Sequence, residues 1–339
     1  MVSIGEVAQR AGVSTATVSR ALSGRAHVSE ATRQRVVQAA KELGYTASAA
    51  ASSLASGRTK NVGIVVPFLD RWYFSTVLTG ISESLVRAGY DVTLYNVTDD
   101  QQIRKRIFLS FVQRRRVDGM IVVAMELDER ESAQLRQLNI PVIATGGPSP
   151  NFNAFAIDDE AVARLAVDHL IRLGHRAIGH IGGNPDFDLD FHVPTRRRQG
   201  FEQALLHAGV QPNPALYEMA DFTIEGGYRA AKQLLGRPGT GMTAIFAASD
   251  EMAIGAILAA RDLGLQVPRD LSLIGIDGHS LGHTLQLTTV DQFPQRQGQI
   301  AAESMVALLE GKADPHSEQA HDLPYELVVR GTTAAPPAD

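Results

Sequence analysis

The sequence predicts an all-α helix-turn-helix head followed by an α/β core of two doubly wound, parallel-sheet lobes. Three observations support this fold class. The first 45 residues contain three short helical patterns separated by turns. From residue 61 onward, apolar strand-like runs alternate with amphipathic helices about every 25–30 residues, which is the rhythm of βαβ units. That rhythm restarts after residue 158, so we expect two similar lobes.

The composition is that of an ordinary globular protein. The 339 residues leave room for two or three domains, with 44% hydrophobic and 20% charged residues. The absence of cysteine excludes disulfides and thiolate metal sites. The N-terminus lacks the pattern of a signal peptide, and no apolar run approaches the roughly 20 residues of a membrane span. We therefore expect a cytoplasmic protein without a membrane partner.

The net charge of −5 is unevenly distributed. Residues 1–60 carry eight Lys and Arg residues against three acids, a net charge of +5, which leaves −10 for the other 279 residues. A small basic head on an acidic body indicates that only the head meets a polyanion such as DNA.

The head reads as a helix, a glycine turn, a second helix and a supporting helix. An apolar stripe from Ile4 to Ala11 ends at Gly12, and Ser14 can cap the second helix by accepting a backbone N–H. The third helix is expected to start at Ser29 and end at Gly44. This layout is that of a helix-turn-helix domain, which lays its second helix in the major groove of DNA. The positions of the second and third helices expected to face the core are Val18, Ala21, Leu22, Val36, Ala40 and Leu43.

Two strings in the head, SIGEVAQRAGVSTATVSRALSG and VSEATRQRVVQAAKELGY, resemble the DNA-binding head of the LacI/GalR family of repressors. The body is similar to the periplasmic-binding-protein-like core of that family over residues 61–331. The similarity is greatest in DEAVARLAVDHLIRLGHRAIGHIGG and ASDEMAIGAILAARDLGLQVPRDLSLIGID. The domains expected from this resemblance are a helix-turn-helix domain at 1–45, a hinge helix or linker at 46–60, an N-terminal lobe of 61–158 plus 291–320, a C-terminal lobe of 159–290 plus 321–331, and a disordered tail at 332–339.

The resemblance implies that Thr15, Ala16 and Arg20 read DNA bases. An arginine can form two parallel hydrogen bonds with guanine O6 and N7, and the Ala16 methyl group can contact the methyl group of thymine. Contacts to phosphates fix the register of the head without reading the sequence. The side chains expected to make them are Ser14, Thr17, Ser19 and His27.

The segment TASAAASSLASGRT, residues 46–59, carries little apolar surface and should be disordered alone. In the family this segment is a hinge helix that folds only on operator DNA, and its leucine, here Leu54, wedges into the minor groove. A flexible linker is the alternative that composition allows. The family usually has proline at the position of Ala47 and arginine at the position of Ser52, so we expect weaker hinge contacts here.

The resemblance also places a small-molecule pocket on the strand-end loops between the lobes. Aromatic rings there can stack on a sugar or base, although each could instead plug the lobe interface. Asp277 can accept hydrogen bonds from vicinal hydroxyls, whereas Ser249 stands where many relatives have asparagine. The family's Asp-Arg pair is replaced by Gly146-Gly147, which leaves space for a bulkier ligand or removes a contact. The residues expected to bind the effector are Trp72, Tyr73, Phe74, Arg197, Phe222, Ser249, Asp277 and Gln292.

The pentapeptide GHSLG at 278–282 fits the G-x-S-x-G pattern of a serine hydrolase and follows a strand at 271–276. A nucleophile elbow joins a strand to a helix, but the residues from Leu285 to Val290 read as another extended segment. A serine hydrolase using Ser280 therefore remains only a remote alternative, and we predict that the chain is not an enzyme. A solute-binding protein, the third hypothesis, would carry a signal peptide and would not need a basic head.

Metal sites are also disfavoured by the sequence. The run DFDLDF places Asp186, Asp188 and Asp190 like the opening of a calcium loop, but Phe191 and Arg197 stand where glycine and glutamate are needed. The histidines do not show the spacing of a helical zinc site. We expect neither metal nor cofactor.

Together these observations predict a homodimeric, effector-controlled transcriptional repressor that binds a palindromic operator in double-stranded DNA. The effector is expected to be a sugar or sugar derivative, and the alternative is a purine or nucleoside acting as corepressor. A sugar-type inducer would release the DNA, whereas a purine-type corepressor would tighten the complex, and the sequence does not determine the sign.

Overall fold

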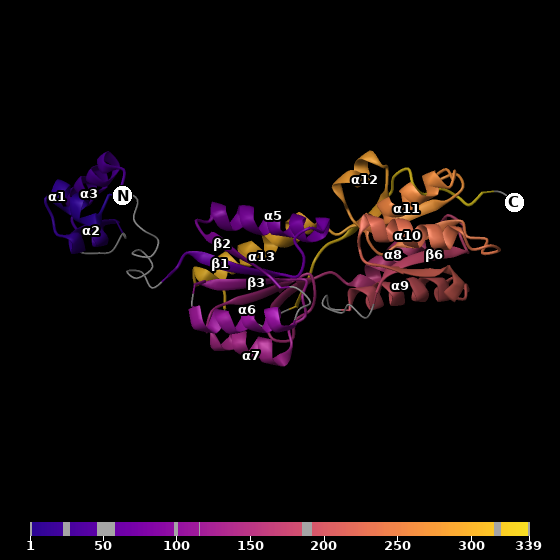
Figure 1. The fold of residues 1–339 in the computed structure, drawn as a ribbon, viewed down its shortest axis with the longest axis horizontal. Helices are drawn as coiled ribbons and strands as arrows, with labels where there is room; N and C mark the ends of the chain where they lie inside the picture. The colour runs from indigo at the N-terminus through magenta and orange to yellow at the C-terminus, as the bar shows by residue number, and fades with distance from the viewer. Residues whose placement is uncertain are drawn as a thin grey trace. The chain divides into compact units, whose positions relative to one another are not determined.

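A computed structural model describes residues 2–22, 28–45, 58–97, 101–114, 116–184, 192–314 and 320–337 (Figure 1). The chain divides into two compact units. One unit comprises Met1–Asn61 with Arg116–Asp118, and the other comprises Val62–Arg115 with Gly119–Asp339. The first contains the helical head and the second contains both lobes of the core.

The head contains three helices that pack on one another: α1 (Ile4–Ala11), α2 (Thr15–Leu22) and α3 (Glu30–Leu43). Helix α1 begins with a capping box at Ser3 and ends at Gly12, whose φ of 66° is a conformation that glycine adopts without steric cost. Val18 is fully buried in the head's core. Leu22, the last residue of α2, is 37% exposed, so its expected inward position is wrong.

The first sheet has the order β11-β5-β4-β3-β1-β2. Its pairs β1–β3, β3–β4, β4–β5 and β5–β11 are parallel. Helices α5 and α13 pack together on one face, and α6 and α7 pack together on the other (Figure 1). The elements of this lobe are β1 (Asn61–Val66), α5 (Trp72–Arg87), β2 (Asp91–Asn96), α6 (Gln101–Arg114), β3 (Gly119–Val123), α7 (Glu129–Gln137), β4 (Val142–Thr145), β5 (Asn153–Ala156), α13 (Pro294–Leu309) and β11 (Ala320–Asp322).

The second sheet has the order β12-β10-β9-β8-β6-β7, in which β12 runs antiparallel to β10. Helices α8 and α9 form one pair, and α10 and α11 form another. Strands covered by helices on both faces are apolar along their length, and β8 and β9 are buried at every position. The elements are α8 (Asp159–Arg172), β6 (Ile178–Gly183), α9 (Val193–His207), a 3₁₀ turn at Pro214–Leu216, β7 (Tyr217–Ala220), α10 (Ile224–Leu235), β8 (Ala244–Ala247), α11 (Asp250–Asp262), β9 (Ser272–Asp277), α12 (Ser280–Thr284), β10 (Thr288–Asp291) and β12 (Glu326–Val328).

The chain passes between the two sheets three times, after β5, after β10 and after β11. The last passage comes two residues later than the expected boundary at 320, because His321 and Asp322 pair with Phe155 and Ala156 in the first sheet. Each lobe is therefore assembled from segments that are distant in the sequence.

The C-terminal tail corrects one expectation. Residues 332–339 were expected to be disordered, but the described part of this segment is tied to the second lobe. The backbone N–H of Leu273 donates to the Thr332 carbonyl at 2.8 Å, and the Thr332 hydroxyl donates to the Leu273 carbonyl at 2.7 Å. The Ala334 carbonyl is 2.8 Å from Nε2 of the buried His175. The order of the tail comes from these partners and not from its own composition.

Among the helices of the described ranges, none is long and apolar enough to cross a membrane.

Candidate functional site

The exposed face of α2 presents the side chains expected to read DNA bases. Thr15, Ala16 and Arg20 are all exposed. The Ser14 hydroxyl caps the helix by accepting from the Thr17 N–H at 3.2 Å, and it lies 2.9 Å from the Thr17 hydroxyl. The cap fixes where the helix starts, and so it fixes the position from which the three exposed side chains project.

The structure describes only some of the other residues expected to contact DNA. Ser19 is half-buried on α2. His27, Leu54 and the hinge positions Ala47 and Ser52 lie outside the described residues. Their expected roles stay predictions from the sequence.

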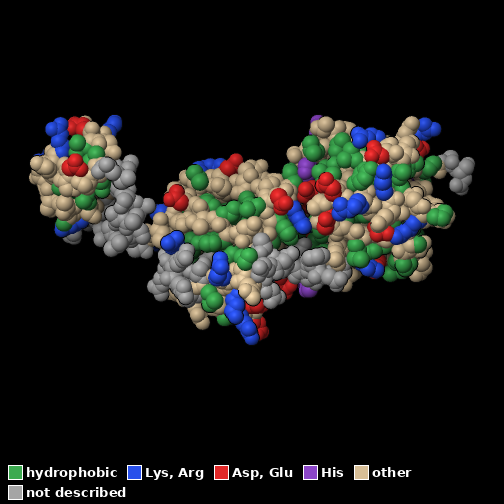
Figure 2. Space-filling view, in the orientation of Figure 1, with side chains coloured by type: hydrophobic (Ala, Val, Ile, Leu, Met, Phe, Trp, Pro, Cys, Tyr) green, Lys and Arg blue, Asp and Glu red, His purple; other side chains and the backbone are tan. Residues whose placement is uncertain are grey.

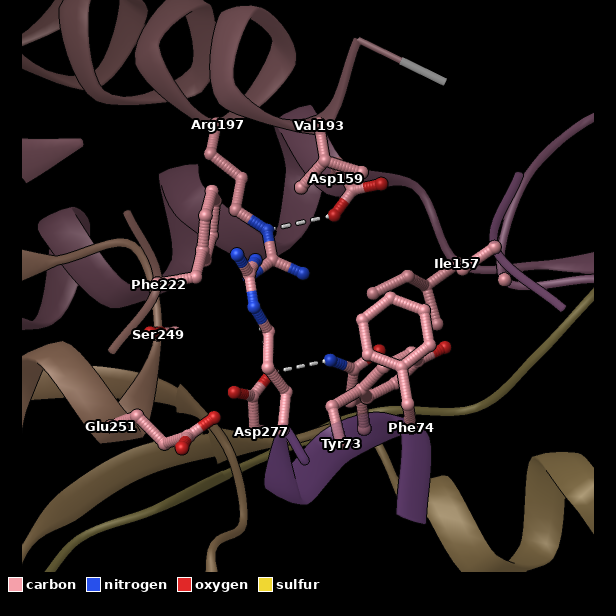
Figure 3. Close-up of a pocket in the computed structure, with 14 residues that line it drawn as sticks. Tyr73, Phe74, Ile157, Asp159, Val193, Arg197, Phe222, Ser249, Glu251 and Asp277 are labelled. Atoms are coloured by element: carbon pink, nitrogen blue, oxygen red, sulfur yellow. Dashed lines mark hydrogen bonds and ion pairs between the residues drawn. The ribbon is translucent and has the colours of Figure 1, made fainter. Parts of the chain in front are cut away.

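A pocket lies between the lobes, at the carboxyl ends of strands from both sheets (Figure 3). Open α/β sheets bind ligands at this end of their strands. Arg197, Phe222, Ser249, Glu251 and Asp277 lie on one side, facing a side that includes the first-lobe rings of Tyr73 and Phe74 (Figure 3). Seven of the eight residues expected to bind an effector line this pocket, the exception being Trp72.

Arg197 is the charged centre of the pocket and is only 5% exposed. Its Nε donates to Oδ1 of Asp159 at 2.8 Å, and its Nη1 donates to the carbonyl of Ala248 and lies 3.9 Å from Oδ1 of Asp277. Burial alone would lower the pKa of Arg197, but the two carboxylates outweigh it and raise the pKa. The cation is therefore already compensated before any ligand enters.

Asp277 ends β9 and is 5% exposed. Its φ of 133° lies in the left-handed half of the Ramachandran map, and the following Gly278 has a φ of 78°. Burial raises the pKa of Asp277, although Arg197 acts in the opposite direction. A strained, desolvated carboxylate of this kind is typical of a functional site. A donor that replaces lost water would stabilise its charged form.

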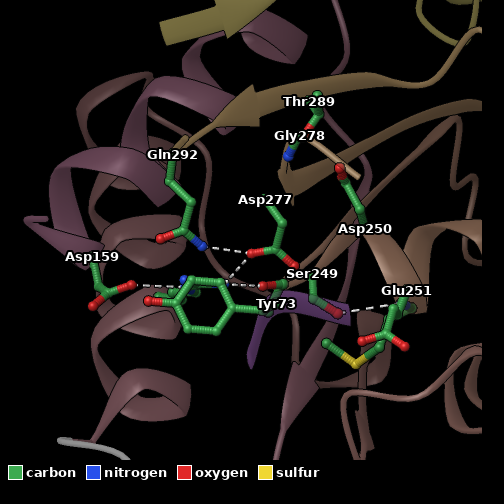
Figure 4. Close-up of polar contacts among 12 residues, drawn as sticks. Tyr73, Asp159, Ser249, Asp250, Glu251, Asp277, Gly278, Thr289 and Gln292 are labelled. Carbon is green, nitrogen blue, oxygen red and sulfur yellow. Dashed lines mark hydrogen bonds and ion pairs between the residues drawn. The ribbon is translucent and has the colours of Figure 1, made fainter. Parts of the chain in front are cut away.

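A chain of hydrogen bonds runs from Asp277 to the first lobe, and Figure 4 shows its first bond, between Gln292 and Asp277. The amide nitrogen of Gln292 donates to Asp277 Oδ1 at 2.6 Å. The amide nitrogen of Gln297, on α13, is 3.1 Å from Gln292 Oε1 and 2.7 Å from the Gln292 carbonyl. The Tyr73 hydroxyl donates to Gln297 Oε1 at 2.9 Å.

Aromatic and aliphatic groups form the rest of the wall. Phe222 has a φ of 58°, and a Cβ on Gly183 would come within 2.2 Å of its ring. The glycine therefore allows the ring to lie against the end of β6. Phe74 packs edge-on against Phe68, with ring centroids 5.5 Å apart, and against Tyr73 at 5.3 Å. The rings of Phe74 and Phe222 line the pocket from opposite lobes.

Trp72 is absent from the pocket lining and instead joins the lobes beside it. Its ring lies 4.4 Å from the ring of His279, and its backbone N–H donates to Glu251 at 3.3 Å. Burial lowers the pKa of His279 to about 4, so this ring is neutral at neutral pH. Of the two readings that the sequence left open for these aromatics, plugging the lobe interface describes Trp72.

Sequence reasoning missed two acidic residues of the pocket, Asp159 and Glu251. Burial, followed by the charge of Asp277, raises the pKa of Glu251 to about 7. Both residues come shortly after a strand and at the start of a helix. An acid at that junction caps or complements the helix N-terminus in many proteins, so the pattern alone does not distinguish a pocket residue.

At the Gly146 corner the sequence left two alternatives, space for a bulkier ligand or the loss of a contact. A Cβ on Gly146 would lie 2.9 Å from the Tyr73 hydroxyl and 2.9 Å from the Ala124 Cβ, at a φ of 84°. The Tyr73 hydroxyl therefore lies beside Gly146, which itself lines the pocket. The oxygen that the pocket presents in this corner belongs to Tyr73.

The GHSLG stretch also corrects an expectation. The segment from Leu285 to Val290 was expected to follow it as an extended run. Thr288 to Val290 do lie in β10, but the one-turn helix α12 begins at Ser280, and Leu285 is its C-cap. The helix forms because Nδ1 of His279 accepts from the Leu281 N–H at 3.0 Å. Ser280 is exposed, and among the described residues its hydroxyl makes no hydrogen bond to a histidine. A short helix is thus present, but the base of a hydrolase is not positioned.

Metal ligands do not gather in the parts of the chain that the structure describes, where no cluster of three His, Asp or Glu residues fits a metal ion. The calcium-like run at 186–191 lies outside those parts. Acidic and basic side chains are interspersed on the face of the core shown in Figure 2.

Comparisons with known proteins match both the head and the core of this chain. Residues 3–48 match the bacterial regulatory proteins of the lacI family, and residues 167–333 match the periplasmic binding protein-like domain. The HTH-type transcriptional repressor CytR of Escherichia coli (strain K12) is 34% identical over 338 residues, which cover 98% of this chain and 96% of that protein. The HTH-type transcriptional repressor PurR of Serratia proteamaculans (strain 568) is 34% identical, with 99% of this chain and 98% of that protein covered. The lac repressor dimer bound to operator and the anti-inducer ONPF superposes with a TM-score of 0.85 and 28% identity, over 98% of this chain and 99% of that chain.

Proposed function

Because this chain belongs to the lacI family of bacterial regulatory proteins, it is a transcriptional repressor, and we propose that an uncharged, hydroxyl-bearing ligand between its lobes controls its affinity for a palindromic operator. The observation that carries this proposal is the buried Arg197, which two carboxylates already compensate inside the pocket.

The DNA-binding part of the proposal rests on α2 and on the likeness to a repressor dimer solved on its operator. Two copies related by a two-fold axis place two copies of α2 on the two halves of a palindrome. Thr15, Ala16 and Arg20 read the bases of each half-site. Leu54 enters the minor groove between them. A repressor of chromosomal genes works in the cytoplasm, which is where we place it.

The charge balance of the pocket favours an uncharged effector over an anionic one. Arg197 is matched by Asp159 and Asp277, and the lining also includes Arg71 and Glu251, whose pKa burial raises to about 7. A phosphate group would meet these carboxylates in a site of low dielectric, where repulsion between like charges is strong. We therefore expect a sugar or a nucleoside and not a sugar phosphate.

The pocket favours a ligand with hydroxyl groups on one side and an apolar face on the other. The carboxylate of Asp277 only accepts hydrogen bonds, so it prefers vicinal hydroxyls as partners. The rings of Phe74 and Phe222 can contact the face of a pyranose or a base. A nucleoside and a sugar both meet this description.

A thermal-shift measurement on the full-length protein tests the proposal. A ligand that binds only the native state raises the melting temperature. The probes are D-ribose, cellobiose, adenosine and cytidine, with D-ribose 5-phosphate as the anionic comparison. We expect at least one neutral probe to raise the melting temperature and to change operator affinity, with the direction of that change giving the sign of regulation.

The matched variants are Asp277→Asn, which keeps the shape of the side chain but not its charge, and Asp91→Asn as a control at an exposed position at the start of β2. We expect the shift to be lost in the first and kept in the second. Stabilisation by the phosphate alone, or an unchanged shift in Asp277→Asn, would contradict the proposed ligand class.

A further inference from the structure

Gln297 is a buried polar residue beside the pocket that does not itself line it. It lies on α13, is 2% exposed and connects two residues that do line the pocket, Tyr73 and Gln292. Its position follows from the close contact of α13 with α5. A Cβ on Gly298 would lie 2.1 Å from the Val77 carbonyl, and one on Gly80 would lie 2.0 Å from the Gln295 carbonyl. The two glycines bring the helix backbones together, so the amide of Gln297 reaches the Tyr73 hydroxyl.

The direction of each hydrogen bond between Asp277 and Tyr73 follows from the bond at Asp277. Oδ1 of Asp277 accepts from the amide nitrogen of Gln292 at 2.6 Å, and this bond fixes which way the Gln292 amide faces. That leaves the amide oxygen of Gln292 facing Gln297, which must present its own nitrogen. The remaining oxygen of Gln297 then requires Tyr73 to donate its hydroxyl proton.

The phenol can meet this requirement because burial and the nearby carboxylates of Asp159 and Asp277 raise the pKa of Tyr73 and keep it protonated. Once the proton is committed to Gln297, the Tyr73 oxygen has only lone pairs to offer a ligand. Oδ1 of Asp277 likewise acts as an acceptor. The two groups, one from each lobe, are therefore both acceptors.

We propose that Gln297 is a positioning residue that makes the pocket specific for a ligand with two hydrogen-bond donors, one for the Tyr73 oxygen and one for Asp277. Gln297 acts by holding the Tyr73 phenol in the corner above Gly146 with its proton turned away from the ligand. A ligand that presents an ether oxygen to Tyr73 leaves two acceptors facing each other. This proposal rests on the proposed function, since it concerns the specificity of the same pocket.

The first arm of the test needs no ligand and asks whether the hydrogen bond between Tyr73 and Gln297 forms in solution. Melting temperatures are measured for the wild type, Tyr73→Phe, Gln297→Leu and the double variant. If Tyr73 donates to Gln297, Tyr73→Phe lowers the melting temperature by several degrees in the wild type and by less in the Gln297→Leu background. Additive losses would overturn the proposal.

The second arm measures specificity with adenosine, D-ribose and their derivatives methylated on both vicinal hydroxyls. The dissociation constants are read from the fluorescence of Trp72, which is the sole tryptophan and lies at the lobe boundary. In the wild type we expect the parent compound to bind at least about 100-fold more tightly than its methylated derivative, because two buried acceptors lose their donors. In Gln297→Leu the Tyr73 hydroxyl is free to turn its proton toward an ether oxygen, and the ratio should fall about tenfold.

The control is Gln295→Leu, the same substitution at an exposed position two residues earlier on α13, where the ratio should stay at its wild-type value. A merely structural Gln297 would weaken parent and derivative equally, and an unchanged ratio would overturn the proposal while leaving the proposed function intact. If none of the four neutral probes binds the wild type, the ligand class under the proposed function is wrong and the specificity proposal falls with it.

Discussion

Replacing Glu251 with glutamine should stabilise the core at high pH relative to low pH. Glu251 is partly buried on α11, and its carboxylate accepts the backbone N–H of Trp72 across the lobe boundary. Glutamine keeps the shape and one acceptor oxygen but cannot ionise. The variant therefore removes the cost of the charge without removing the hydrogen bond.

The magnitude follows from the pKa, which burial raises from 4.5 to about 7. Between these values the folded state binds a proton that the unfolded state has released. The free energy of unfolding of the wild type therefore falls as pH rises through this window and stays low above it. A tenfold change in proton affinity is worth about 1.4 kcal/mol, which sets an upper limit of about 3.4 kcal/mol. Because water screens a partly exposed carboxylate, we expect about 1–2 kcal/mol.

The assay is urea unfolding of both proteins at pH 5 and at pH 8, followed by Trp72 fluorescence, which reports on the core and not on the head. Other titrating groups are present in both proteins and cancel in the difference. The stability of Glu251→Gln relative to the wild type should be about 1–2 kcal/mol more favourable at pH 8 than at pH 5. An equal difference at the two pH values would refute the argument that burial holds this carboxylate near neutrality.

Three further predictions concern the head, the hinge and the tail. Arg20→Ala should cost about 1–3 kcal/mol of specific operator binding in gel shifts, and little on scrambled DNA, because only the guanine contact reads sequence. Leu54→Ala should likewise weaken binding to an operator selected in vitro far more than binding to random DNA. Equal losses on the two DNAs would refute the insertion of Leu54 into the minor groove. Thr332→Val should lower the free energy of unfolding of the core by about 1–3 kcal/mol, because its buried hydroxyl accepts one hydrogen bond and donates another within the second lobe. Urea unfolding measures that loss, and an unchanged stability would mean that the tail is not held as described.

The local patterns in the sequence predicted the parts of the structure that depend on neighbours along the chain. Helical periodicity and the glycines at 12 and 44 located the three helices of the head. The repeating strands predicted two parallel sheets, and the strand-end rule placed seven residues around one pocket. Family resemblance contributed the choice among strand-end residues, which periodicity alone does not make.

One expectation that failed depends on a contact between distant segments, and another depends on a local helix cap. Trp72 lies next to two pocket residues in sequence, but it packs on His279 of the other lobe. The GHSLG stretch forms a short helix because the side chain of His279 caps it.

The sequence by itself determined the order of the elements, the basic head and the residue types at the strand ends, because these follow from local periodicity and charge. Only the tertiary structure decided which of those residues face the pocket. Tyr73 and Gln297 are 224 positions apart, and neither residue carries a local sign of the other. Their hydrogen bond exists because two helices from opposite ends of the chain pack at glycine contacts in a desolvated interior, where a polar group must find a partner.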